Sequence, residues 1–150
     1  MVPQVRAWPI SQPRVTPKRP PTRPMAPKAK VLIIDDDKTL VAILSASLRA
    51  AGYHVLAAYD AMQGFMLAQR EVPAVILLDL QLPAGGGLQL LEKIAASGKT
   101  HAIPVVMVTG TTDPKLEAET KAKGAAGFVH KPVEPKAIIA LVGDFMEKKD

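Results

Sequence analysis

The sequence predicts an α/β fold in which five parallel strands form one doubly wound sheet. From residue 30 onward, short β-branched apolar runs alternate with segments of helical spacing. Three of these runs are apolar throughout, as strands buried on both faces of a sheet must be. The alternation repeats five times within residues 31–150, and because βα crossovers are short and right-handed, one layered domain follows.

The first βα unit has the clearest pattern. Residues 31–34 (VLII) are a continuous apolar run, and Leu40, Leu44 and Leu48 recur every four residues, which predicts a helix over 38–51. Gly52 follows and is typical of a helix end. The other strands are expected at 54–58, 74–78, 105–108 and 127–129, and the other helices at 61–70, 87–97, 114–123 and 136–148.

Acidic residues followed by proline mark the starts of the last two helices. Asp113-Pro114 and Glu134-Pro135 each place an acidic residue before a proline at the first helical position. Proline is tolerated there because the first amide groups of a helix have no partner within it.

Composition limits the classes of protein to consider. With 48% hydrophobic and 22% charged residues in 150, the chain can bury a core and global disorder is excluded. The chain has no cysteine, so disulfides, cysteine metal sites and thiol nucleophiles are excluded. The sequence holds no apolar run of about 18 residues and no signal peptide. We therefore expect a cytoplasmic protein with no membrane contact.

Residues 1–29 differ from the rest and are expected to form a disordered, proline-rich, basic tail. Residues 1–30 hold eight of the 14 prolines, and they hold seven basic residues and no acidic one. The net charge of the whole chain is +5, so this segment accounts for the basic character of the protein. The segment 1–24 could be an upstream extension, with Met25 as the working start. Nucleic-acid binding through the tail is an alternative, although Trp8 is its only aromatic residue for stacking.

Polar side chains follow four of the predicted strands. Because the carboxyl ends of parallel strands meet at one edge of the sheet, we expect these side chains to lie together. Clustered carboxylates repel one another by about 4 kcal/mol per pair at about 4 Å, so a counter-charge is required. Oxygen ligands without histidine or cysteine favour Mg²⁺, or Mn²⁺, over Zn²⁺. The residues are Asp35-Asp36-Asp37, Asp79, Thr109 and Lys131.

These residues, over about 31–148, resemble the receiver domain of two-component response regulators. The resemblance implies a flavodoxin-like (βα)5 domain over residues 30–150 with strand order 2-1-3-4-5. It implies that Asp79 accepts a phosphoryl group from a phosphohistidine on a sensor histidine kinase or a histidine phosphotransfer protein, so that the chain is a phosphoacceptor rather than an enzyme. Asp36 is then the direct Mg²⁺ ligand, with Asp35 near it or acting through water.

The resemblance also assigns the remaining site positions. Asp79 and the backbone carbonyl of Gln81 complete the metal ligands, and Thr109 and Lys131 bind the phosphoryl oxygens. Thr109 and Phe128 are the expected switch residues, although a plain core phenylalanine is the alternative reading of Phe128. The Lys131-Pro132 peptide is expected to be cis, and Asp37 to cap the first helix. The resemblance also places Gln81 and Thr111 beside the path of the attacking water, so exchanging them is expected to alter the dephosphorylation rate.

The segment after Asp79 departs from the family pattern. Of Pro83-Ala84-Gly85-Gly86-Gly87, only Pro83 and Gly87 match, and the extra glycines predict a mobile rim and leave metal affinity open. The triplet lacks the Gly-Lys-Ser/Thr ending of a phosphate-binding loop. The three histidines show no metal-ligand spacing and are expected away from the cluster: His54, His101 and His130.

The leading hypothesis is a stand-alone receiver whose output is a protein contact biased by phosphorylation, because residues after the last helix leave no room for an output domain. Direct DNA binding is not expected. One alternative is a phosphatase of the haloacid dehalogenase type, which requires a second acid where Gln81 stands. Another is a degenerate receiver that acts only as a scaffold.

Overall fold

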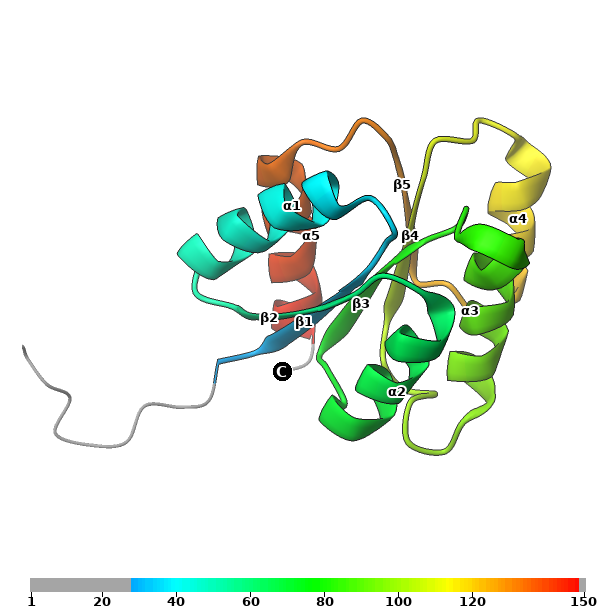
Figure 1. Cartoon of the computed structure of the whole chain (residues 1–150), viewed down its shortest axis with the longest axis horizontal. Helices are drawn as coiled ribbons and strands as arrows, with labels where there is room; N and C mark the ends of the chain where they lie inside the picture. Colours follow the sequence, from blue (N-terminus) through cyan, green and yellow to red (C-terminus); the bar gives the residue numbers. More distant parts are fainter. Residues whose placement is uncertain (1–27, 149–150) are drawn as a thin grey trace, which may run out of the picture.

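Each apolar run predicted from the sequence forms a strand of one parallel sheet. The computed structural model, which describes residues 28–148, has the strand order β2-β1-β3-β4-β5 (Figure 1). This order confirms the doubly wound, flavodoxin-like fold. The strands are β1 (Lys30–Ile34), β2 (His54–Ala58), β3 (Val75–Asp79), β4 (Val105–Thr109) and β5 (Gly127–His130).

One helix follows each strand, and the helices cover both faces of the sheet (Figure 1). A short 3₁₀ turn, η1, precedes the third helix and spans Pro83–Gly85. The helices are α1 (Lys38–Ala50), α2 (Ala61–Glu71), α3 (Gly86–Ala96), α4 (Pro114–Ala122) and α5 (Pro135–Lys148).

Alternate residues of each central strand serve opposite faces of the sheet. In β1, Val31 and Ile33 belong to the core formed with α1 and α5, whereas Leu32 and Ile34 belong to the core formed with α2 and α3. All four are at most 2% exposed. The sheet therefore needs apolar residues at every strand position, which explains the continuous runs in the sequence.

Several element ends differ from the predicted bounds by one residue. The strands β3 and β4 reach Asp79 and Thr109, because the hydrogen-bonded ladder includes both residues. They were expected just after their strands, and they are instead the last residues of them. The ladder thus fixes the backbone of two polar site residues.

Aspartates cap the starts of three helices, and the sequence predicts two of them, Asp37 and Asp113. The carboxylates of Asp37, Asp60 and Asp113 each accept a backbone N–H from the first turn of α1, α2 and α4. Asp37 is therefore a helix cap, as predicted. At the other end of α1, Gly52 has φ +102°, a conformation that favours glycine.

Two further expectations concern the chain beyond the sheet. Within the described residues, no helix is both long enough and apolar enough to cross a membrane. The predicted tail, with Trp8 and Met25, lies outside the described residues except for positions 28 and 29.

Candidate functional site

Three carboxylates meet at the carboxyl edge of the central strands. Asp35 and Asp36 follow β1, Asp79 ends the neighbouring β3, and one oxygen of each lies within 4.8 Å of the others. Asp35 and Asp79 are each only 3% exposed, whereas Asp36 is exposed. The structure thus brings together the three aspartates that the sequence selected, two of them buried.

Local hydrogen bonds hold Asp35 and Asp36 near each other although consecutive strand residues point in opposite directions. The N–H of Asp35 still donates to Ala58 O in β2, at 3.1 Å. Its carboxylate then accepts the N–H of Asp37 at 2.9 Å, so that the chain turns immediately after the strand. This turn lets an exposed Asp36 remain beside two buried carboxylates.

Lys131, just beyond β5, supplies the positive charge at this cluster. Its Nζ lies 3.1 Å from Asp35 Oδ2 and 3.6 Å from Asp79 Oδ1. Burial lowers the pKa of Lys131, but the hydrogen bond and charge of Asp35, with the charge of Asp79, outweigh burial and raise it. The lysine therefore stays an ammonium ion between two acids.

The pKa of Asp79 is raised above the usual value of an aspartate, first because burial disfavours its charged form. The Gln81 N–H, which donates to Asp79 Oδ1 at 3.0 Å, lowers the pKa, and so does Lys131. The negative charges of Asp35 and Asp36 raise the pKa of Asp79. One ammonium group thus leaves the charge of the three carboxylates incompletely balanced.

The donor set suits a hard divalent cation. Three carboxylates and one ammonium group leave an excess negative charge in a partly buried site, and oxygen ligands of this kind match Mg²⁺ or Mn²⁺. None of the three histidines takes part in this cluster of described residues, as the sequence predicted.

Thr109 links the end of β4 to Lys131. Its side chain is fully buried, and its hydroxyl oxygen accepts the N–H of Thr111 at 3.1 Å. Its carbonyl oxygen accepts the N–H of Lys131 at 2.7 Å. The Lys131-Pro132 peptide is cis, as expected. These bonds fix the Thr109 hydroxyl and the Lys131 backbone on adjacent strand ends.

Gln81 and Thr111 stand on neighbouring loops of the same edge. A Cβ placed on Gly110 would lie 3.6 Å from Gln81 Oε1, so the Gln81 side chain reaches toward the loop that follows β4. Gln81 is exposed and Thr111 is partly buried. Both side chains are therefore at least partly open to solvent, and the backbone N–H groups of both residues bond to site side chains, those of Asp79 and Thr109.

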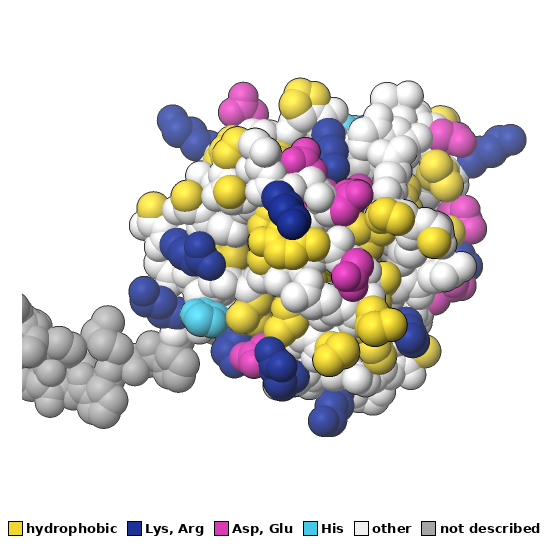
Figure 2. Space-filling view, viewed as in Figure 1, with side chains coloured by type: hydrophobic (Ala, Val, Ile, Leu, Met, Phe, Trp, Pro, Cys, Tyr) yellow, Lys and Arg dark blue, Asp and Glu magenta, His cyan; other side chains and the backbone are white. Residues whose placement is uncertain are grey.

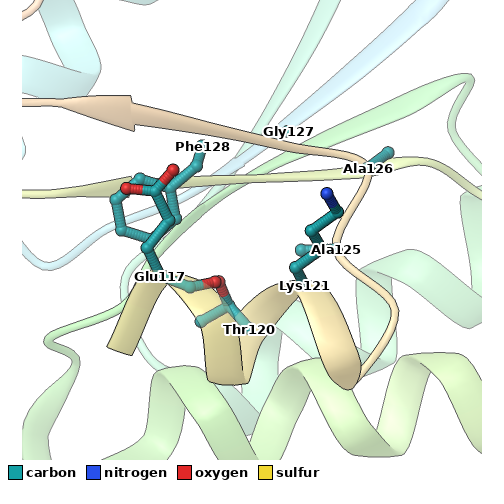
Figure 3. Close-up of a pocket in the computed structure, with 7 residues that line it drawn as sticks. All are labelled: Glu117, Thr120, Lys121, Ala125, Ala126, Gly127 and Phe128. Atoms are coloured by element: carbon teal, nitrogen blue, oxygen red, sulfur yellow. The ribbon is translucent and has the colours of Figure 1, made fainter. Parts of the chain in front are cut away.

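Phe128 lies on the face of the sheet that α4 covers. It is partly buried and lines a cavity of about 240 Å³ together with Glu117, Thr120 and Lys121 of α4 (Figure 3). Its ring contacts that of His130 edge to face, with centroids 5.2 Å apart. The sequence argument missed this contact, although the two residues stand two positions apart in a strand and so share a face.

The glycine-rich segment after β3 forms a 3₁₀ turn and the first turn of α3. Gly86 and Gly87 belong to the first turn of α3, and Gly85 ends the preceding 3₁₀ turn. A Cβ on Gly87 would lie 2.6 Å from the carbonyl carbon of Leu80 and closer still to the carbonyl oxygens of Asp79 and Leu80. Glycine at 87 therefore lets α3 start directly against the backbone that carries Asp79.

Comparison with known proteins gives one consistent result. The sequence profile described as Response regulator receiver domain matches residues 31–143. The protein PilH of Pseudomonas aeruginosa is 32% identical over 114 residues, which cover 76% of this chain and 94% of PilH. Other curated relatives are longer, and the chain spans about half or a quarter of their length.

Solved structures agree with the sequence comparison. A CheY-like receiver domain protein from Methanospirillum hungatei superposes with a TM-score of 0.75 at 26% identity, covering 81% of this chain and 95% of that one. The chemotaxis response regulator CheY4 of Vibrio cholerae gives 0.74 at 30% identity, covering 79% and 98%. With the acidic cluster, Thr109 and Lys131 in place at the sheet edge, the chain belongs to the response regulator receiver domain family of two-component systems.

Proposed function

We propose that Asp79 is the phosphoacceptor of this receiver domain and takes its phosphoryl group from a phosphohistidine of a sensor kinase or a phosphotransfer protein. The observation that carries the proposal is the meeting of Asp79 with two further carboxylates and with the Lys131 ammonium at one sheet edge. Phosphoryl transfer depends on position and on charge stabilisation, and this arrangement offers both. The receiver unit in this proposal comprises residues 30–150, with residues 1–29 as an appended basic segment.

The transfer step follows from the contacts of Asp79. Oδ1 accepts the Gln81 N–H and faces Lys131, so Oδ2 is the oxygen that attacks phosphorus. A bond forms between Oδ2 and phosphorus while the bond between phosphorus and the donor's imidazole nitrogen breaks, and that nitrogen keeps the electron pair. The product is an acyl phosphate on Asp79. Lys131 and the Thr109 hydroxyl then bind its oxygens.

The carboxylates of Asp35, Asp36 and Asp79, with the backbone carbonyl of Gln81, would hold Mg²⁺ or Mn²⁺. When bound, the cation neutralises charge on the transferring phosphoryl group. Lys131 already lies close to two of these carboxylates, which keeps them together before any phosphodonor arrives.

Phosphorylation would alter the surface that Phe128 and α4 share. If the Thr109 hydroxyl turns toward the new phosphate, it leaves the Thr111 N–H, to which it is bonded in this structure. The loop between β4 and α4 then has a reason to move, and the cavity beside Phe128 lies next to that helix (Figure 3). The proposed output is therefore a change in protein binding at α4 and β5.

The direct test is incubation of the full chain with Mg²⁺ and acetyl phosphate, followed by intact mass measurement. We expect one added phosphoryl group on the parent chain and none on Asp79→Asn. The matched control is Asp144→Asn, an exposed aspartate of α5, which should be phosphorylated like the parent. A phosphoryl group that persists in Asp79→Asn would refute the assignment.

A further inference from the structure

A groove between α2 and α3 lies outside the site described above. It encloses about 240 Å³ and begins at Ala61 and Gly86, near the starts of the two helices. The side chain of Leu90, which is buried, and that of Phe65, which is partly buried, line it. The lining is mainly apolar, so water in the groove has few hydrogen-bond partners on the protein.

Two methionines on the rim of this groove are unusually exposed. Met62 is 76% exposed and Met66 is 58% exposed, and they stand four residues apart on the same side of α2. Figure 2 shows hydrophobic side chains gathered over α2 on the viewed face, next to Lys and Arg side chains. Methionine is flexible and polarisable and is common on surfaces that bind apolar partner side chains.

The groove continues into a cationic end. A second hollow, of about 340 Å³, shares Met66 with the first and is lined also by Arg70 and Lys99. Lys93 lines the first hollow, with Nζ 4.8 Å from the centre of the Phe65 ring. Among the described residues that line the two hollows, none is acidic.

The acid that pairs with Arg70 does not neutralise this end. Glu71 accepts from Arg70 Nε at 3.2 Å with one oxygen and from Lys30 Nζ at 3.1 Å with the other. One carboxylate thus serves two cations, while the Arg70 side chain is 67% exposed. The surface at this end keeps an excess of positive charge.

We propose that this groove binds an amphipathic helix of a protein partner. Its apolar side chains pack against Met62 and Met66, and its carboxylates face Arg70 and Lys99. From Ala61 to Arg70 the groove follows α2 for about 14 Å, at about 1.5 Å per residue, which a partner helix of about ten residues matches. Binding of an apolar helix face in such a groove is an established mode of peptide recognition.

Charge decides between this occupant and the chain's own N-terminal segment. Residues 1–29 contain six basic residues and no acid, so they carry the same sign of charge as Lys93, Arg70 and Lys99. An acidic partner segment has the complementary charge. The groove shares no residue with the phosphoacceptor cluster, so it is a separate surface of the domain.

The test uses the full chain with isotope-labelled methionine methyl groups, observed by NMR. The probe is a synthetic helical peptide of about 12 residues, or about three turns, with leucines on one face and glutamates in its last turn. A second peptide carries lysines in place of those glutamates. We expect saturable shifts at Met62 and Met66, little change at the fully buried Met107, and at least about tenfold tighter binding of the acidic peptide.

Variants locate the binding surface. The double variant Met62→Gln, Met66→Gln should bind the acidic peptide at least about tenfold more weakly than the parent does. The matched control is Ile43→Gln, which removes an apolar side chain that is 50% exposed on α1 and should leave binding unchanged. Lys99→Gln should reduce the preference for the acidic peptide, and Asp79→Asn should bind as the parent does.

Four outcomes would overturn the proposal. The first is an absence of shifts at Met62 and Met66, and the second is equal affinity for the two peptides. The third is unchanged peptide binding in the double methionine variant. The fourth is a groove that is already filled by another part of the protein or by a second copy of it. Shifts that depend on protein concentration without peptide would identify a second copy as the occupant. Contacts of the Trp8 ring with the two methyl groups would identify the N-terminal segment instead.

Discussion

Replacing Gly87 with alanine should destabilise the protein through the backbone next to Asp79. The new Cβ would lie 2.6 Å from the carbonyl carbon of Leu80, whereas carbon atoms pack favourably at about 3.5–4.0 Å. The two backbones must therefore separate by about 1 Å. The atoms in the way are backbone atoms, which cannot rotate aside as a side chain can.

The size of the effect follows from two opposing contributions. Overpacking of a buried contact costs about 1–3 kcal/mol, and the rigidity of the backbone here favours the upper end. Alanine in a helix is up to about 1 kcal/mol better than glycine, which offsets part of this. We expect Gly87→Ala to lower the free energy of unfolding by about 2 kcal/mol.

Gly86→Ala is the matched control because it makes the same chemical change one residue earlier. Its Cβ would lie 3.3 Å from the Cβ of Ala61, a contact that a shift of a few tenths of an ångström relieves. Because alanine is also better than glycine in a helix, the free energy of unfolding should stay near the parent value or rise by up to about 1 kcal/mol.

Urea unfolding measures both glycine variants, with equal slopes as the check that the unfolding transition is comparable. The rate of phosphorylation by acetyl phosphate should fall in Gly87→Ala, because the strained segment carries Asp79 and Gln81, and stay near the parent's in Gly86→Ala. Equal stability of the two variants would refute the reasoning.

Three further predictions concern single residues. Asp79→Asn should raise the free energy of unfolding at neutral pH without Mg²⁺, because the raised pKa of Asp79 means that the folded state disfavours its charged form. This gain should shrink as the pH falls through the raised pKa of folded Asp79, and it should be lost below about 4, where the carboxyl group is neutral in the unfolded chain as well. A gain in urea unfolding that does not vary with pH contradicts the electrostatic cause. Val72→Asn should stabilise the protein by about 1 kcal/mol, because Val72 has φ +43° at the end of α2 and asparagine tolerates this conformation better than a β-branched residue. Thermal and urea unfolding measure the change, and a loss of stability counts against this reasoning. Exchanging Gln81 or Thr111 for alanine should change the lifetime of the acyl phosphate. Intact mass measured at intervals after removal of the phosphodonor gives this lifetime. An unchanged lifetime in both variants would show that neither residue lies on the path of water.

The sequence was sufficient to predict the fold and to predict which residues form the acidic cluster. Continuous apolar runs identified buried parallel strands, and strand ends in a parallel sheet share one edge, so Asp79 and Lys131 could be placed together although 52 positions separate them in the sequence. The first inference rests on the local periodicity of the chain, and the second on the general rule that parallel strands end at one edge of their sheet.

What the sequence could not provide are contacts that depend on how separate elements pack. The exposure of Met62 and Met66 is one case, because the same spacing on a helix is equally typical of a core face. The role of Gly87 is another, since its close approach to the end of β3 depends on where α3 packs against that strand. The division of Asp35 and Asp36 into a buried and an exposed carboxylate is a third.

The order of the site residues along the chain has a consequence for synthesis on the ribosome. The three aspartates emerge well before Lys131, which follows the final strand. A nascent chain that has begun to pair β1 with β3 therefore holds repelling acids together without their ammonium partner. Completion of β5 supplies that partner, so the edge on which the chemistry depends is secured only after four of the five strands have been translated.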